Sequence, residues 1–153
     1  MQPNVKPYWQ NYINGKWVDA SDGGRLSVLN PATEEPLAEV AKATPKDVDA
    51  AVAAARACHE SRALSGMRPR VRGQLLVEMG RMLRQRKEEI ARLLSIDAGK
   101  RISEARSEIE GSARYFEFYG GLAPSVEGKY VPLGDGYTDF VVPVPFGVTA
   151  HMT

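Results

Sequence analysis

A chain of 153 residues with 43% hydrophobic and 25% charged residues has the length and composition of one ordinary globular domain. Twenty lysines and arginines stand against nineteen aspartates and glutamates, so no strong net field attracts nucleic acid or an anionic membrane surface. The sequence also lacks an apolar run of membrane-spanning or signal-peptide length. We therefore expect a cytoplasmic protein with neither a nucleic-acid nor a membrane partner.

Residues 8 to 40 carry the signals of short β-strands joined by tight turns. Asn14-Gly15 separates two apolar pairs and favours the two positive φ angles of a type I′ hairpin. A turn at residues 21–24 leads to two further short strands, which are joined through Asn30-Pro31. These residues predict a small β-structure ahead of a helical body.

Three helices are predicted next. Thr44 offers a capping hydroxyl and Pro45 suits the first helical position, so the first helix is expected to run to about Glu60. Between residues 69 and 94 the apolar residues recur at three- and four-residue spacing, which is typical of helices with one buried face. The charged run at residues 87–89 predicts a break that divides this stretch into two helices.

A long helix and a hairpin follow. The helix is predicted from Ile102 to Tyr119, with Tyr119 at the end of its apolar stripe, and Gly120-Gly121 predicts its C-terminal end. Residues 129–142 predict a β-hairpin around the turn Gly134-Asp135-Gly136. No helical pattern beside this hairpin would bury it, which suggests an arm that pairs with another chain.

The last fourteen residues have the β-branched and aromatic content of a strand. Pro143 and Pro145 confine its first half to an edge or a crossover, whereas the residues from Gly147 onward suit a parallel strand covered on both faces. Such a strand needs a neighbour and a crossover connection. We therefore expect the chain to be part of a larger protein, and an independent helical binding domain is the least favoured interpretation.

Six motifs occur in the order and at the spacing of one enzyme family. They are I-N-G-K-W-V, L-N-P-A-T-E-E, D-V-D-A-A-V-A-A-A-R, S-I-D-A-G-K-R-I-S-E-A, Y-F-E-F-Y-G-G and P-F-G-V. Over residues 8 to 153 the chain resembles the amino-terminal third of an NAD(P)-dependent aldehyde dehydrogenase.

The resemblance implies an α/β fold, of which this chain would hold an incomplete N-terminal portion. Residues 1–125 would form the N-terminal part of the cofactor-binding domain. Residues 126–144 would form part of the oligomerisation hairpin, and residues 145–153 the interrupted start of the Rossmann-like sheet. A homo-oligomer, either a dimer or a tetramer, is expected through the hairpin arm.

The family's chemistry is also implied by the resemblance. A cysteine thiolate attacks the aldehyde, an oxyanion site with an asparagine holds the intermediate, hydride passes to NAD or NADP, and a glutamate-activated water releases the acid. In that family these residues follow the P-F-G-V strand, so no catalytic residue is assigned here and the isolated chain is expected to be inactive. Cys58, the sole cysteine, is expected to be a small buried residue.

Two groups of residues match binding positions of the family. Asp97 matches the carboxylate of a monovalent-cation site for Na⁺ or K⁺, whose other ligands include the carbonyls of Val28 and Leu29; alternatively, Asp97 caps the turn into the next helix. Met152 and Thr153 match residues that contact the dinucleotide.

Ser107 and Gly111 fall near the family's substrate-tunnel wall, although a surface serine and a packing glycine are the more ordinary interpretation. The competing hypothesis for the whole chain is a non-catalytic assembly module that acts through the hairpin of residues 129–142.

Overall fold

The computed structural model describes residues 5 to 152. The strands are β1 (Tyr8–Trp9), β2 (Asn11–Ile13), β3 (Lys16–Val18), β4 (Arg25–Leu29), β5 (Pro36–Ala41), β6 (Lys129–Val131) and β7 (Asp139–Val141). The helices are α1 (Pro45–Glu60), α2 (Pro69–Gln85), α3 (Lys87–Ala98), α4 (Ile102–Leu122) and the 3-10 turn η1 (Ala123–Ser125). None of the helices in this part of the chain has the length and hydropathy to cross a membrane.

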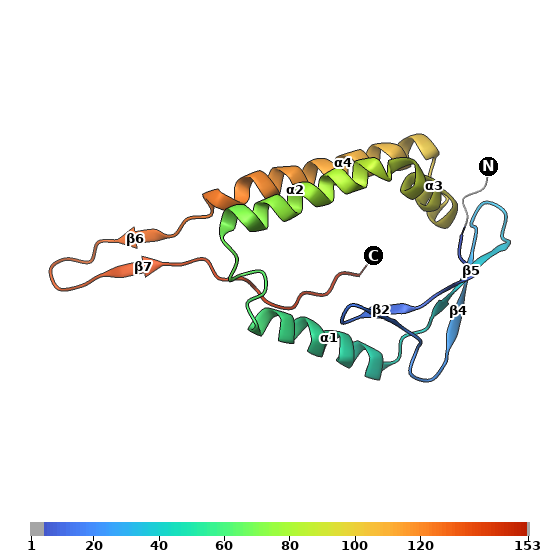
Figure 1. Ribbon diagram of the computed structural model, residues 1–153, viewed down its shortest axis with the longest axis horizontal. Helices are drawn as coiled ribbons and strands as arrows, with labels where there is room; N and C mark the ends of the chain where they lie inside the picture. The colour runs from blue at the N-terminus through green and yellow to red at the C-terminus, as the bar shows by residue number, and fades with distance from the viewer. Residues whose placement is uncertain (1–4, 153) are drawn as a thin grey trace.

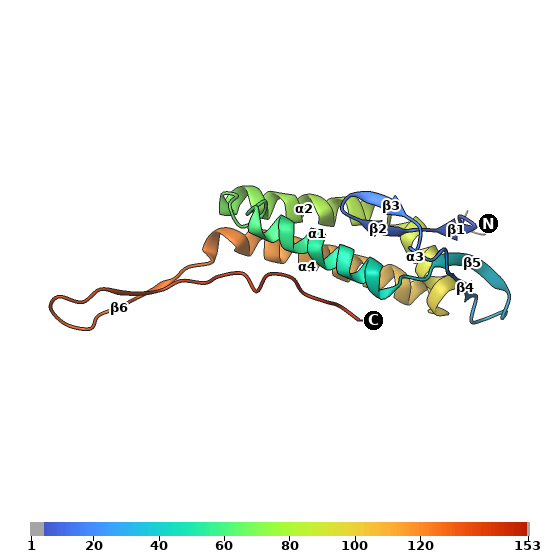
Figure 2. The ribbon, with the colours of Figure 1, turned by 90° about the horizontal axis from the view of Figure 1, so that it is seen from below.

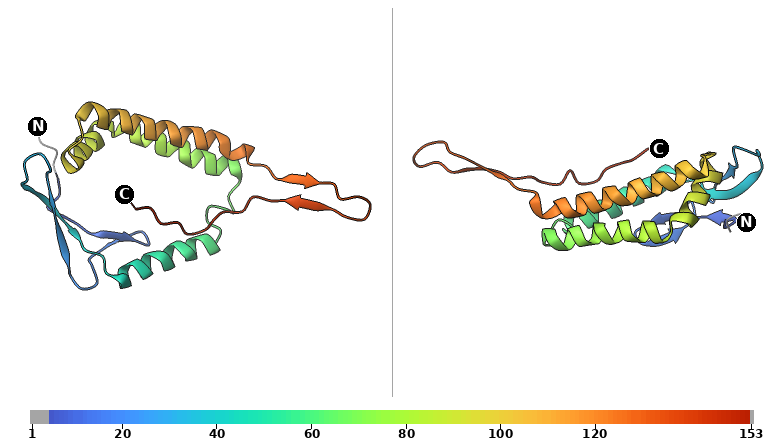
Figure 3. Two further views of the ribbon diagram at one scale, coloured as in Figure 1. Left: turned by 180° about the vertical axis from the view of Figure 1, so that it is seen from behind. Right: turned by 90° about the horizontal axis from the view of Figure 1, so that it is seen from above.

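The elements form an elongated molecule rather than a closed globule. Helices α2 and α4 lie side by side along most of their length, and α3 lies at one end of the pair (Figure 1). Strands β1 to β5 gather at that same end, whereas the β6–β7 hairpin projects from the opposite end (Figures 2 and 3). The projecting hairpin predicted from residues 129–142 is therefore present.

The N-terminal β-structure follows the turn signals in the sequence. Asn14 (φ 51°) and Gly15 (φ 75°) both have positive φ angles in the turn that joins the antiparallel strands β2 and β3. Strand β5 lies between β1 and β4, parallel to β1 and antiparallel to β4. The Asn30 side chain accepts a hydrogen bond of 2.9 Å from the Ala32 amide in the turn between β4 and β5.

Helix α1 begins at the predicted residue. Thr44 and Asp47 form a reciprocal capping box, in which the Asp47 carboxylate accepts a 2.8 Å hydrogen bond from the Thr44 amide. The same carboxylate accepts a 3.1 Å bond from the Ser21 amide, so it also ties the turn after β3 to the helix. These hydrogen bonds, the one from Thr44 first, lower the pKa of Asp47 because they stabilise its charged form.

The prediction that Gly120-Gly121 ends the long helix is wrong. Helix α4 continues through both glycines to Leu122, because Gly120 serves a contact between helices rather than a turn. A methyl group on Gly120 would lie 2.7 Å from the Gly73 carbonyl oxygen of α2, and one on Gly80 would lie 2.8 Å from the carbonyl oxygen of Ala113. The absence of side chains at these positions lets the backbones of α2 and α4 approach closely.

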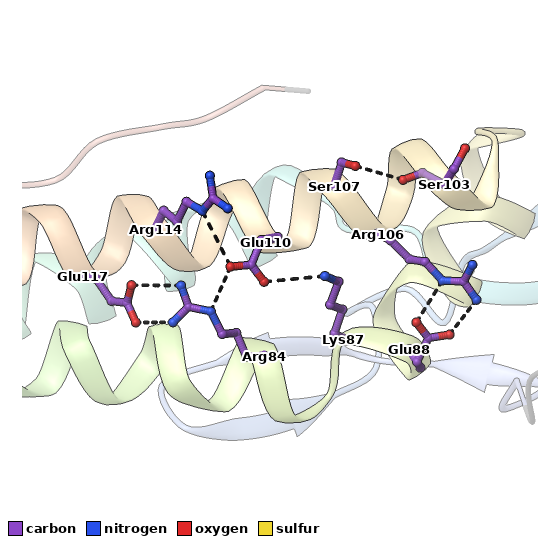
Figure 4. A network of polar contacts seen from close by, with 9 residues as sticks. All are labelled: Arg84, Lys87, Glu88, Ser103, Arg106, Ser107, Glu110, Arg114 and Glu117. Atoms are coloured by element: carbon purple, nitrogen blue, oxygen red, sulfur yellow. Dashed lines mark hydrogen bonds and ion pairs between the residues drawn. The ribbon is translucent and has the colours of Figure 1, made fainter.

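An ionic network lies along the rim of the α2–α4 contact (Figure 4). The Arg84 guanidinium of α2 donates to Glu110 at 3.0 Å and to Glu117 at 2.9 Å, both on α4. Lys87 is 3.5 Å from the second oxygen of Glu110. The hydrogen bonds from Arg84 are the main reason why the pKa values of both glutamates lie below their usual range.

Helices α2 and α3 are separate, as the charged run at residues 87–89 predicted. The break is at Arg86, after which the chain turns so that Glu88 of α3 meets Arg106 of α4 in a two-bond pair at 2.8 Å. A small apolar cluster fills the junction of α3 with α4. Its buried members are Ala91, Ala105 and Ile109, and its partly buried members are Leu83, Ile90, Leu94 and Ile102.

The buried apolar residues of the described chain are alanines, apart from Ile109. They are Ala20, Ala41, Ala91, Ala105, Ile109, Ala113 and Ala123. Helix α2 instead exposes large apolar side chains, since Val71, Leu75, Met79 and Met82 are each at least 43% exposed. Helices α2 and α4 therefore pack tightly while leaving apolar faces open, as an incomplete portion of an α/β fold would.

The segment predicted as the start of a sheet has no strand in the described residues. Phe146 is fully exposed and Met152 is 97% exposed, and the chain from Val142 to Met152 makes no ladder with a neighbouring strand. A strand of a parallel sheet exists through its hydrogen-bonded neighbours, and the described residues offer none here.

The glycine contact between the helices gives a matched test. We expect Gly120→Ala to destabilise the helix pair by about 1–3 kcal/mol, because the added methyl group must push two backbones apart. Gly121→Ala is the control, since a methyl group there meets nothing within 4 Å. This substitution should raise the free energy of unfolding by up to about 1 kcal/mol, because alanine has the higher helix propensity. Urea unfolding followed by circular dichroism at 222 nm measures both, and equal effects would contradict the packing role.

Candidate functional site

The end of α3 lies beside the turn that follows β4. Gly99 (φ 66°) ends α3 in the left-handed conformation, and a methyl group on it would lie 3.0 Å from the Pro31 ring. Asp97 stands shortly before Gly99 in the chain, and Val28 and Leu29 stand shortly before Pro31. The two segments that carry the predicted cation ligands therefore meet at Gly99 and Pro31.

The ladder between β4 and β5 is irregular at the strand end that carries Val28 and Leu29. Leu29 lies opposite Pro36, which has no N–H to donate, and the β4–β5 register shifts between Val28 and Leu29. Asp97 is exposed, and no ion pair involves it within residues 5 to 152. The negative end of the α3 dipole lies at the same place, which favours positive charge.

The alternative prediction, in which Asp97 caps the next helix, is wrong. Asp97 lies inside α3, and Arg101 occupies the cap position of α4 without a side-chain hydrogen bond. No group of three or more histidines, cysteines, aspartates or glutamates gathers at metal-binding distance in the described part of the chain. A cation here would depend mainly on backbone carbonyls.

An open hollow of about 410 Å³ lies on the outer face of α4. Its lining residues are Gly111, Arg114, Tyr115, Phe118 and Tyr119. A methyl group on Gly111 would meet nothing within 4 Å, so the packing interpretation of this glycine is wrong. Ser107 is exposed and donates a 3.1 Å bond to the Ser103 carbonyl of its own helix (Figure 4), as an ordinary surface serine does.

The aromatic part of this hollow was not anticipated. Tyr115, Phe118 and Tyr119 are 67%, 63% and 56% exposed, and the rings of Phe118 and Tyr119 meet edge to face at 5.2 Å. The signal was present in the run Y-F-E-F-Y, since four aromatic residues within five positions exceed what one buried stripe of a helix holds. The prediction that Tyr119 lies on the buried stripe is wrong.

Two other predictions concern Met152 with Thr153, and Cys58. Met152 is almost fully exposed, and Thr153 lies outside the described residues. Cys58 is exposed rather than buried, which corrects the expectation for it. It borders a hollow of about 220 Å³ between the end of α1 and the C-terminal segment, where His59 lies close to Gly147.

Comparison with known proteins identifies one family. The model of the aldehyde dehydrogenase family matches residues 17–153. A betaine aldehyde dehydrogenase of Rhizobium etli (strain CIAT 652) is 36% identical over 146 residues, which are 94% of this chain and 29% of the relative.

Solved structures agree with this match. An aldehyde dehydrogenase of Bacillus cereus (G224D mutant) superposes with a TM-score of 0.83 at 30% identity, over 92% of this chain and 30% of its own. A betaine aldehyde dehydrogenase mutant of Staphylococcus aureus in complex with NAD⁺ gives a TM-score of 0.78 at 27% identity, over 81% of this chain and 25% of its own. The chain spans less than a third of the length of these relatives. The chain belongs to the aldehyde dehydrogenase family.

Proposed function

We propose that this chain forms the N-terminal part of an NAD(P)-dependent aldehyde dehydrogenase, which oxidises an aldehyde to a carboxylic acid. The observation that supports this most is the family match over residues 17–153, together with a fold that superposes on dehydrogenases of known structure. Within that enzyme, residues 1–125 form the N-terminal part of the cofactor-binding domain, beside the cofactor sheet. Residues 145–153 enter the sheet, and Met152 and Thr153 face the dinucleotide.

The described residues offer no catalytic constellation for this reaction. Thiol-dependent aldehyde oxidation needs an activated cysteine and a general base. Cys58 is exposed at the end of α1, and no cation or base pairs with its thiol in the described part of the chain. We infer that the 153 residues position substrate and cofactor, and that the reacting groups come from elsewhere in the enzyme.

The first test is aldehyde-dependent formation of NADH or NADPH, followed at 340 nm. We expect no activity from the 153-residue chain, and activity from the same chain when it is extended through any coding sequence that follows. As a control, Cys58→Ser in the extended protein should retain activity, because the thiol at this position has no catalytic role. Turnover by the short chain, or loss of turnover in the Cys58→Ser protein, would contradict the proposal.

We further propose that the carbonyls of Val28 and Leu29 and the carboxylate of Asp97 hold a Na⁺ or K⁺ ion. Support comes from the packing of Gly99 on Pro31, from the interrupted ladder at Leu29, and from the negative end of the α3 dipole. A hard monovalent cation takes oxygen ligands of this kind. Such an ion would fix the end of α3 to the end of β4.

Cation binding predicts a stabilising effect that depends on Asp97. At equal ionic strength, KCl or NaCl should raise the thermal unfolding midpoint relative to choline chloride, because an ion that binds the folded state alone stabilises it. In Asp97→Asn this difference should vanish, whereas Asp135→Asn in the hairpin tip should keep it. A difference that persists in Asp97→Asn would rule out this site.

The alternative is an assembly module that acts through the β6–β7 hairpin. The hairpin has two unpaired strand edges and an exposed aromatic pair, Tyr130 and Phe140, whose rings lie 5.7 Å apart. Such an edge is a template for pairing with another strand. In the complete enzyme the same arm would join subunits into a dimer or a tetramer.

Association through the β6–β7 arm can be distinguished from non-specific association through other exposed apolar side chains. We expect the chain to associate. The double variant Tyr130→Ser/Phe140→Ser should lower the mass measured by light scattering after size exclusion, since these two rings are exposed apolar surface on the arm. The matched control is Tyr115→Ser/Phe118→Ser, which removes two exposed aromatic rings from α4 instead. Equal effects of the two double variants would mean that the arm has no special role.

A further inference from the structure

The turn between β2 and β3 exposes an asparagine that is followed directly by a glycine. Asn14 and Gly15 are both exposed, with φ angles of 51° and 75°. Within residues 5 to 152 no hydrogen bond involves the Asn14 side chain, and a methyl group on Gly15 would meet nothing within 4 Å. The side-chain amide of Asn14 and the backbone nitrogen of Gly15 are therefore accessible neighbours in the chain.

The other asparagines of the described residues have different surroundings. Asn30 precedes Pro31, whose backbone nitrogen carries no hydrogen, and its side chain accepts a 2.9 Å hydrogen bond from the Ala32 amide. Asn11 is half-buried within β2, where its side-chain nitrogen is buried, and a bulky tyrosine follows it. Among these residues, only Asn14 combines an exposed amide with a following residue that has no side chain.

The β2–β3 hairpin is short and has few neighbours. Each strand has three residues, and the two strands form a sheet of their own (Figure 2). Its aromatic pair, Tyr12 and Trp17, has ring centroids 4.9 Å apart, but the two residues are 62% and 57% exposed. An isolated two-stranded hairpin is only marginally stable in water, and exposed elements of this kind open locally at low cost. Opening lets the backbone of Asn14 rotate out of the turn conformation.

We propose that Asn14 is a site of spontaneous deamidation and isoaspartate formation. The backbone nitrogen of Gly15 attacks the side-chain carbonyl carbon of Asn14, and the bond from that carbon to its amide nitrogen breaks. Ammonia leaves with the proton that the Gly15 nitrogen gives up, and a cyclic succinimide remains. Glycine favours this step because it has no Cβ to crowd the approach, and the reacting atoms are already neighbours in the chain.

Water then opens the succinimide at either of its two carbonyl groups. Attack at the side-chain carbonyl gives aspartate, whereas attack at the backbone carbonyl gives isoaspartate, in which the main chain continues through the former side chain. Both products replace a neutral amide by a carboxylate. The reaction needs water alone and does not depend on the proposed dehydrogenase function.

The two products should affect the hairpin differently. Aspartate followed by glycine suits the same type I′ turn. Isoaspartate adds one methylene group to the main chain inside the turn, which no longer fits the register that places Ile13 opposite Lys16. The contact between Tyr12 and Trp17 on the adjacent pair of positions should then be lost.

The reaction is measured in the 153-residue chain by peptide mass spectrometry that sequences each asparagine separately during incubation in warm, mildly alkaline buffer. We expect Asn14 to convert at least about tenfold faster than Asn11 or Asn30. The rate should rise with pH, because the Gly15 nitrogen must lose its proton. Unfolding in guanidinium chloride should accelerate Asn14 by less than about tenfold, since the hairpin opens readily in the folded chain.

Variants separate the chemistry from its effect on structure. In guanidinium chloride, where turn strain plays no part, Gly15→Ala should slow the conversion, because a methyl group crowds the attacking nitrogen. In the folded chain, Asn14→Asp should keep the near-ultraviolet circular dichroism of the aromatic pair. The isoaspartate form, separated by chromatography, should lose part of that signal.

Four outcomes would each overturn the proposal. They are undetectable conversion of Asn14, equally fast conversion of Asn11 or Asn30, protection of Asn14 by more than about tenfold in the folded chain, and a near-ultraviolet spectrum of the isoaspartate form that equals that of Asn14→Asp. Because none of these measurements needs turnover, failure here is distinguishable from failure of the dehydrogenase assay.

Discussion

The close approach of α2 and α4 is the constraint on which the rest of the described structure depends. It requires two positions without side chains on α2, Gly73 and Gly80, and the small residues Ala113 and Gly120 opposite them. Backbone atoms then meet backbone atoms, and dispersion contacts replace the interlocking of large side chains. With so little apolar volume between the helices, the ionic pairs of Arg84 along the rim help to hold their relative position.

The close approach of α2 and α4 also affects which side chains lie on the outer face of α4. Where α4 meets α2 most closely it carries Ala113 and Gly120, and three of its aromatic residues, Tyr115, Phe118 and Tyr119, lie on the outer face around the hollow. Glu110 connects the inner and outer faces of α4. It pairs with Arg84 of α2 on the inner side and with Arg114, which lines the hollow, on the outer side. The packing of the helix pair and the charge balance on the outer face of α4 are thus connected through one carboxylate.

Local signals predicted local structure well. The Asn14-Gly15 turn, the capping box of Thr44 and the break before α3 each depend on a few neighbouring residues, and the structure has all three. The role of Gly120 could not be predicted in this way, because the same residue ends a helix or admits a neighbouring helix depending on what packs against it. The cation proposal has a similar limit: Asp97 was identified through the family pattern, whereas the contact of Gly99 with Pro31 is a tertiary one. The charge of the hollow depends on how Glu110 is shared between helices, which no local pattern contains.

The unit formed by α2, α3, α4 and η1 is also contiguous in the chain. The contacts that join α2, α3, α4 and η1 all lie within residues 69–125. A growing polypeptide could therefore complete this unit as soon as these residues leave the ribosome, before the β6–β7 hairpin is made. At this stage of synthesis the aromatic residues on the outer face of α4 would be hydrated, and the solvated ion pairs of Arg84 on the rim of the helix pair would favour solubility.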